Sequence, residues 1–83
     1  MDFKNLPFKF DHYYYVEVDG TGQNARVYNQ NYEDVALTAQ QSKKVAACFV
    51  WAITSGLVSM NTGIFFARPN QNGEIKVTWS NYP

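Results

Sequence analysis

The sequence contains a single cysteine, Cys48, and a single histidine, His12. One cysteine excludes an intramolecular disulfide, whereas secreted domains of this size usually have several, so we expect a cytoplasmic protein. Metal sites need histidine, cysteine or carboxylate side chains at short spacings, and no such spacing is evident. Residues 1–20 also lack a basic segment followed by an apolar run, the pattern of a signal peptide. The sequence therefore predicts no metal, no cofactor and no secretion.

Charged residues are scarce, and long apolar runs are absent. Charged side chains make up 17% of the chain, and seven basic residues balance seven acidic ones. Nucleic-acid binding relies on neutralisation of phosphates, so zero net charge makes a nucleic-acid partner the weaker expectation. The longest apolar run extends from Val45 to Ile53, well short of the ~20 residues that span a bilayer. We therefore expect a soluble protein with a protein partner and no membrane contact.

Aromatic residues, in contrast, are abundant. The 83 residues include six Phe, six Tyr and two Trp, and 46% of the chain is hydrophobic. A chain of this length forms one domain and buries only about 60–65% of the surface that its unfolded state exposes. Each aromatic ring can remove roughly 150–250 Å² from water, which suits a small core. Residues 1–83 are therefore expected to form a single domain.

Residues 6–18 alternate with a period of two, which predicts a long strand with one buried face. The side chains expected to point inward are Leu6, Phe8, Phe10, His12, Tyr14, Val16 and Val18. Pro7 is expected at the start or on the edge of this strand, because it has no N–H to donate. The turn at residues 19–22 contains two glycines and leads into a return strand over residues 24–29, which completes a hairpin.

A helix is predicted over residues 39–55. Thr38 and Gln41 have the spacing of a capping box, and Gly56 can take the left-handed conformation that ends many helices. Leu57 is then expected to pack back against the last turn. One face of the helix is apolar and is assigned to the core; it consists of Val45, Cys48, Phe49, Ala52 and Ile53.

Residues 29–37 permit two interpretations, a short strand over 32–37 or a first helical turn capped by Asn31, and the extended form is favoured. Two further strands are predicted at residues 64–68 and 74–80, joined by a tight Asn72-Gly73 turn. We therefore predict an α+β fold, in which one helix packs on one face of an antiparallel sheet. The sheet has four strands, or five if residues 32–37 form one, and the order is β-β-(β)-α-β-β.

The residues that could carry catalysis have no suitable neighbours. Cys48 lies in the middle of the helix on its core face, without the basic neighbour or helix N-terminus that activates a thiol. His12 lies on the apolar face of its strand, and no second His or Cys accompanies it. The adjacent Glu33 and Asp34 precede the helix, where solvated acids are common. We therefore predict no catalytic residues and a protein that is not an enzyme.

Two groups of exposed side chains are candidates for contact with a partner. Alternation places tyrosines and an arginine on the polar side of the first hairpin, where rings can anchor an interface or stack on bases. The outer face of the helix also carries apolar side chains, a feature of interfaces. The candidates are Tyr13, Tyr15, Arg26, Tyr28, Val50 and Trp51. The alternatives are that other segments cover Tyr13 and Tyr15, and that a rotated helix lets Trp51 seal the core.

From Phe8 to Trp79 the chain resembles, in size and layout, the small inhibitor proteins encoded by phages and other mobile elements, anti-CRISPR proteins among them. The resemblance implies a non-catalytic protein that inhibits a larger host complex through protein contacts in the cytoplasm of the producing or infected cell. Two alternatives stay open. One is a nucleic-acid binder that stacks bases on the exposed tyrosines and meets phosphates with Lys4, Lys9 and Arg26. The other is a homodimer joined through the outer face of the helix.

Overall fold

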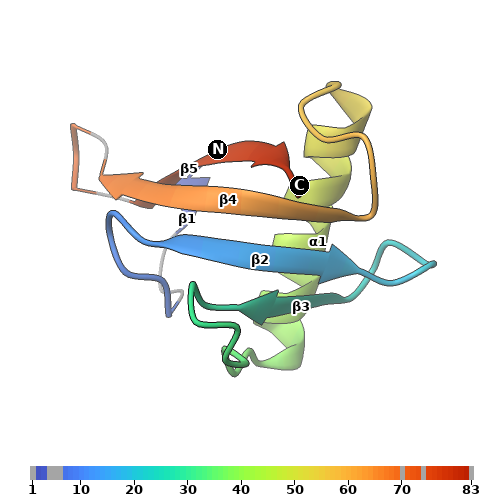
Figure 1. Ribbon diagram of the computed structural model, residues 1–83, viewed down its shortest axis with the longest axis horizontal. Helices are drawn as coiled ribbons and strands as arrows, with labels where there is room; N and C mark the ends of the chain where they lie inside the picture. Colours follow the sequence, from blue (N-terminus) through green and yellow to red (C-terminus); the bar gives the residue numbers. More distant parts are fainter. Residues whose placement is uncertain (1, 4–6, 70, 74, 83) are drawn as a thin grey trace.

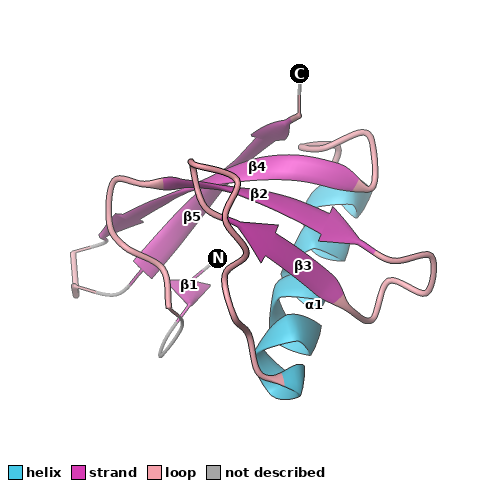
Figure 2. Cartoon of the chain, turned by 60° about the horizontal axis from the view of Figure 1, so that its bottom comes forward, coloured by secondary structure: helices cyan, strands magenta, loops and turns pink. Residues whose placement is uncertain are grey.

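The computed structural model describes residues 2–3, 7–69, 71–73 and 75–82. Its elements, in chain order, are β1 (Asp2–Phe3), β2 (Tyr13–Val18), β3 (Ala25–Tyr28), α1 (Ala39–Thr54), β4 (Thr62–Pro69) and β5 (Ile75–Asn81). The strands form one antiparallel sheet in the order β1-β5-β4-β2-β3 (Figure 1). The helix lies against one face of this sheet and crosses its strands (Figure 2). The predicted α+β fold, with one helix on an antiparallel sheet, is confirmed.

Alternation along the strands decides which side chains face the helix. The buried strand residues are Tyr14, Val16, Val18, Ala25, Val27, Phe65, Ala67 and Val77. Their neighbours in sequence, such as Tyr13 and Glu17, are exposed, as the period of two predicts. From the helix side, the fully buried ring of Phe49 meets Trp79 edge-on, with ring centroids 5.1 Å apart. Only this one face of the sheet is therefore packed into the core.

Both ends of α1 follow the predicted capping patterns. The Thr38 hydroxyl accepts a hydrogen bond from the Gln41 N–H (3.1 Å), and the Gln41 side chain accepts one from the Thr38 N–H (2.9 Å). At the other end Gly56 has a φ of 79°, and the Leu57 N–H donates to the Ala52 carbonyl at 2.9 Å. These bonds form a Schellman motif, so the helix begins and ends within one residue of its predicted bounds.

One prediction for the end of α1 is wrong, because Ile53 belongs to the face predicted to form the core but is 37% exposed. Leu57 is 46% exposed. The chain turns back at Gly56, and the buried side chain that closes this end of the core is Val58, with 1% exposure. Ala46, which was not assigned to the core, is fully buried because its small side chain lets the helix lie close to the sheet.

The predicted strand over residues 6–18 is also wrong in its first half, since β2 begins at Tyr13. The Asp11 N–H donates to the Ala67 carbonyl (2.7 Å), and the Ala67 N–H donates to the His12 carbonyl (3.1 Å). Two residues therefore oppose one, which is a β-bulge, and Asp11 takes the left-handed conformation (φ 63°) that such a bulge requires. A bulge changes which side chains point inward, so alternation cannot be extrapolated across it.

The segment before this bulge folds back onto the core. The Lys9 N–H donates to the Tyr14 hydroxyl at 2.7 Å, and the ring of Phe8 packs against those of Tyr14 and Phe65 with centroids 4.9 and 4.8 Å apart. Phe8 is buried as predicted, but Phe10 is 42% exposed, contrary to the prediction. Leu6 and Lys4 lie outside the described residues.

Residues 32–37 form no strand, and the fifth strand of the sheet is β1. The segment is not helical either, but Tyr32 takes a left-handed backbone conformation (φ 61°), and the strand pairing is limited to an isolated bridge between Tyr28 and Asp34. At the last hairpin, Pro69 pairs with Ile75, so the connection is longer than the two-residue turn predicted at Asn72-Gly73.

Asp19 organises the turn between β2 and β3. Its carboxylate accepts hydrogen bonds from the Thr21 hydroxyl (2.7 Å) and the Asn24 amide (2.9 Å), and these bonds lower the pKa of Asp19 from 3.8 to about 2. Because the folded-state pKa lies below the unfolded value, this contribution to stability is present above pH 3.8 and is lost as the pH falls towards 2. Between pH 5 and pH 2.5, the urea midpoint of Asp19→Asn is expected to fall less than that of the wild type. Equal losses would show that the carboxylate does not stabilise the turn.

Gly63 is expected to tolerate no side chain. A Cβ at this position would lie 2.8 Å from Cε2 of Phe49, whose ring is fully buried and cannot move aside. Gly63→Ala should therefore lower the free energy of unfolding by about 1–3 kcal/mol, measured by urea denaturation. Gly20→Ala is the matched control, since a Cβ there meets nothing within 4 Å, and it should change stability by less than about 1 kcal/mol. Equal effects of the two substitutions would contradict the packing of Phe49 on Gly63.

Candidate functional site

No helix or strand in the described part of the chain covers the face of the sheet opposite α1 (Figure 2). We call this surface the open face; its strand residues are Tyr13, Tyr15, Glu17, Arg26, Tyr28, Thr62, Ile64, Phe66, Arg68, Lys76, Thr78 and Ser80. Tyr15 lies between Tyr28 on β3 and Ile64 on β4, and Tyr13 lies opposite Phe66. Aromatic and apolar side chains thus gather along β2 and its two neighbours.

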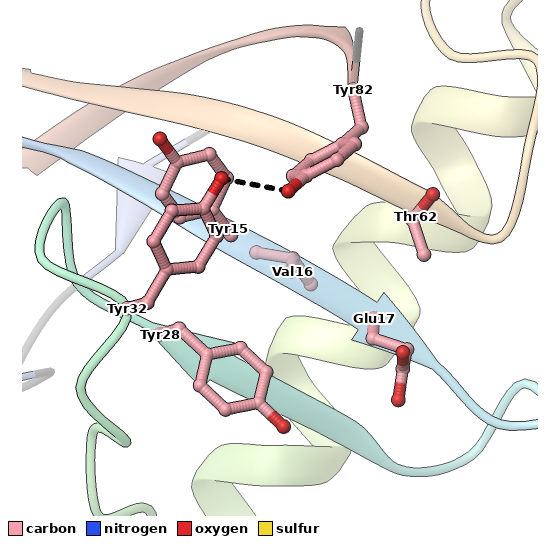
Figure 3. A pocket seen from close by; sticks show the side chains of 7 residues that line it. All are labelled: Tyr15, Val16, Glu17, Tyr28, Tyr32, Thr62 and Tyr82. Atoms are coloured by element: carbon pink, nitrogen blue, oxygen red, sulfur yellow. Dashed lines mark hydrogen bonds between the residues drawn. The ribbon is translucent and has the colours of Figure 1, made fainter.

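Three tyrosines from distant parts of the chain pack together on the open face (Figure 3). The rings of Tyr15 and Tyr32 are stacked, with centroids 4.3 Å apart and planes inclined by 5°. Tyr82 meets Tyr15 edge-on at 5.3 Å, and the hydroxyls of Tyr82 and Tyr32 share a hydrogen bond of 2.7 Å. Ring pairs of this kind contribute roughly 0.5–1.5 kcal/mol each beyond simple burial. Together these contacts hold the three rings in one fixed arrangement.

A pocket of about 350 Å³ opens beside these rings, and we call it the tyrosine pocket. Its lining consists of Tyr15, Val16, Glu17, Tyr28, Tyr32, Thr62 and Tyr82. Figure 3 shows Tyr82 and Thr62 on one side of β2 and Tyr28 on the other, while Val16, beneath the pocket, has its side chain in the core. Glu17 is the one charged residue of the lining. The pocket is therefore aromatic with a single negative group.

Tyr32 owes its position to an unusual turn. The Tyr32 N–H donates to the Asn29 carbonyl (2.9 Å), and the Asn29 N–H donates to the Glu33 carbonyl (2.8 Å), so residues 29–33 form a tight loop. The Asn29 side chain supports this loop by accepting from the Asn31 and Glu33 N–H groups. Tyr32 has a φ of 61°, in the left-handed region where glycine is usual. The backbone therefore bears strain at the residue that stacks on Tyr15.

Tyr82 is placed by the end of β5. Asn81, the last residue of that strand, accepts hydrogen bonds from the Ser59 N–H (2.8 Å) and the Ser59 hydroxyl (3.1 Å). These bonds tie β5 to the segment that follows α1 and aim the next residue at the pocket. The bond from Tyr82, with a smaller effect from Tyr15, raises the pKa of Tyr32. The Tyr32 hydroxyl is therefore neutral at physiological pH.

A second group of side chains lies on the open face away from the pocket. Tyr13 is 47% exposed, and its ring lies 5.9 Å from that of Phe66. The Arg68 guanidinium lies over the ring of Phe66, with its central carbon 4.8 Å from the ring centroid. The charged side chains of the open face are those of Arg26, Arg68, Lys76 and Glu17. The sequence left open whether other segments cover Tyr13 and Tyr15. Tyr32 partly covers Tyr15, whereas Tyr13 is exposed.

The outer face of α1 is exposed as well, but it lies on the far side of the molecule from the tyrosines. Val50 and Trp51 are 39% and 45% exposed, so Trp51 does not seal the core. The turn after β2 lies beside this part of the helix, because a Cβ added to Gly22 would be 3.3 Å from the Val50 side chain. The structure therefore separates the two predicted binding surfaces by the thickness of the sheet and helix.

The structure places the two groups considered for catalysis, Cys48 and His12, in different surroundings. Cys48 is buried, and burial raises the pKa of its thiol, which disfavours the reactive thiolate. His12 is half-buried beside a polar hollow of about 280 Å³ that Lys9 and Glu33 also line. The Glu33 carboxylate accepts a hydrogen bond from the Asn29 amide. In the part of the chain that is described, no carboxylate is hydrogen-bonded to the His12 ring.

Within the described ranges, no group of three or more His, Cys, Asp or Glu side chains could hold a metal ion. No described helix is long and apolar enough to cross a bilayer.

The sequence indicated two of the pocket's tyrosines but missed the other two. Tyr15 and Tyr28 were placed by alternation, whereas Tyr32 and Tyr82 lie in a turn and at a strand end that alternation does not reach. The residue that could have indicated the turn at Tyr32 is Asn29, because asparagine side chains often accept hydrogen bonds from the backbone of a turn. Comparison of the chain with protein families, with curated proteins and with solved structures found no match.

Two substitutions at Tyr32 separate its strain from its contacts. Tyr32→Ala removes the stacking on Tyr15 and the bond to Tyr82 but keeps a side chain in the left-handed region, so it should destabilise the protein by about 1–2 kcal/mol. Tyr32→Gly loses the same contacts but relieves the strain, so it should be more stable than the alanine variant by about 1 kcal/mol. Urea denaturation measures both. A glycine variant no more stable than the alanine variant would show that the turn is unstrained.

Proposed function

We propose that the protein is a non-catalytic binding protein whose open face docks against another protein. The observation that carries this proposal is the cluster of rings on a sheet face that no helix covers in the described structure. In small proteins such rings are normally buried, because each exposes a large apolar area to water. A partner surface that covers them would supply the missing second layer.

The composition of the open face suits protein recognition. Tyrosine and arginine are enriched among the residues that dominate protein interfaces, and the open face has both. Tyrosine rings also lose little conformational entropy on binding, because they have only two rotatable bonds. The two longest dimensions of the molecule, 33 and 26 Å, leave room for a standard interface of roughly 800 Å² per partner.

The simplest role for such a protein is inhibition by occupancy. A protein that binds a functional surface of a larger complex blocks that surface without catalysing a reaction. A small binding protein is therefore sufficient as an inhibitor. The likeness to inhibitor proteins of phages and mobile elements supports the same role. The site of action is then the cytoplasm of the producing or infected cell.

Single-stranded nucleic acid is a second candidate for the open face. Arg68 over Phe66 and the exposed ring of Tyr13 could bind a base and a phosphate. The tyrosine pocket argues against it, because its described lining contains the carboxylate of Glu17 and no basic side chain to meet a phosphate. A protein partner accounts for both groups of rings, so it is preferred.

Site-specific photo-crosslinking tests the proposal. A photoreactive phenylalanine analogue is placed at Thr78, on the open face, or at Trp51, on the outer face of α1, and each protein is irradiated in lysate of the organism that produces it. We expect a discrete protein adduct from position 78 and none from position 51. The adduct at 78 should weaken at least about tenfold in Tyr13→Ala, which removes an exposed ring of the interface.

Three outcomes of this experiment would count against the proposal. An adduct of twice the protein's own mass from position 51 would indicate a homodimer through the helix. A nuclease-sensitive adduct from position 78 would indicate nucleic acid. A protein adduct at 78 that is unchanged in Tyr13→Ala would show that the open face does not carry the binding.

A further inference from the structure

The tyrosine pocket has the composition of a site for an organic cation. Four of its seven lining residues are tyrosines, and they come from β2, β3, the loop after β3 and the end of β5. The face of an aromatic ring carries partial negative charge, so a cation held against it is stabilised. One side of the Tyr32 ring is stacked on Tyr15, and because Tyr32 is 60% exposed, the other side of this pocket-lining ring is open to solvent.

Glu17 adds a full negative charge at the rim of the pocket. It lies two residues along β2 from Tyr15, on the same face of the sheet (Figure 3). Arg26 is its direct cross-strand neighbour, yet within the described residues no ion pair joins the two side chains. The carboxylate is therefore available to a ligand, while the lining supplies no positive charge of its own.

The size and the acceptors of the pocket select one kind of cation. A volume of about 350 Å³ lies at the lower end of the range for ligand pockets and suits a single side chain rather than a larger cofactor. The hydroxyls of Thr62 and Tyr28 add acceptors near the carboxylate of Glu17. A quaternary ammonium group has no N–H to use them, whereas a guanidinium has five N–H donors and a flat face that stacks on rings.

We propose that the tyrosine pocket receives an arginine side chain of the protein partner, with its guanidinium against the tyrosine rings and hydrogen-bonded to Glu17. The inference rests on the proposed function and deepens it, because it names the group by which the open face recognises its partner. The positive charge of Arg26, on the neighbouring strand, opposes the approach of a second cation, so its removal should favour the incoming arginine.

Titration with a blocked Gly-Arg-Gly tripeptide, followed by amide chemical shifts, tests the inference on the wild-type protein. We expect weak, saturable binding with the largest shifts at Tyr15, Glu17 and Tyr32. A tripeptide with citrulline in place of arginine has nearly the same shape without the charge, and it should bind at least about tenfold more weakly. A third tripeptide, with trimethyl-lysine, should also bind more weakly than the arginine peptide.

Three variants assign the binding to the pocket. Glu17→Gln keeps the shape of the side chain and should weaken binding of the arginine peptide roughly tenfold. Arg26→Ala should leave it unchanged or strengthen it. Tyr13→Ala, on the open face but outside the pocket, is the matched control and should have no effect.

Equal binding of the arginine and citrulline peptides, tighter binding of trimethyl-lysine, or full affinity in Glu17→Gln would each overturn the inference. None of these results depends on the partner, so they are distinguishable from a failure of the crosslinking experiment. A partner adduct at position 78 together with an unresponsive pocket would leave the open face as the interface and remove arginine recognition from it.

Discussion

The packing of a single helix against one face of the sheet is the constraint from which the other features follow. The helix brings Val45, Phe49 and Ala52 against the strands, and these side chains are fully buried. The described part of this 83-residue chain has no second helix for the other face, so side chains there must limit their own exposure to water. Tyrosines do so by packing on one another, with hydroxyls directed to solvent or to each other.

The sequence predicted the fold where local patterns act alone and failed where distant segments meet. The caps of α1 lie within a few residues of each other, so Thr38, Gln41 and Gly56 could be assigned correctly. The start of β2 could not, because the bulge depends on Ala67 of β4, more than fifty residues further on. The sidedness of Tyr13–Val18 survived because the bulge lies before this segment and leaves its alternation intact.

The same distinction applies to the candidate site. Tyr15, Arg26 and Tyr28 follow from alternation within one hairpin, and the structure places all three on the open face. Tyr32 was missed because a tyrosine at a left-handed turn position contradicts the usual preference for glycine, and the stacking energy that holds it there comes from Tyr15. A pocket whose lining comes from separate chain segments can be recognised only once the spatial arrangement of those segments is known.

The strain at Tyr32 has a consequence for binding. A left-handed backbone costs roughly 1–2 kcal/mol at a non-glycine residue, similar to the stabilisation from one ring stack and one hydroxyl bond. The strain and the contacts of Tyr32 therefore nearly cancel in the free energy of folding. The contacts nevertheless fix the orientation of the Tyr32 ring at the pocket. A ligand that meets a fixed ring does not lose the entropy of ordering it, so more of the contact energy appears as affinity. A glycine at this turn would relieve the strain with little net change in stability, but it would leave Tyr15 uncovered and the pocket without its outer wall.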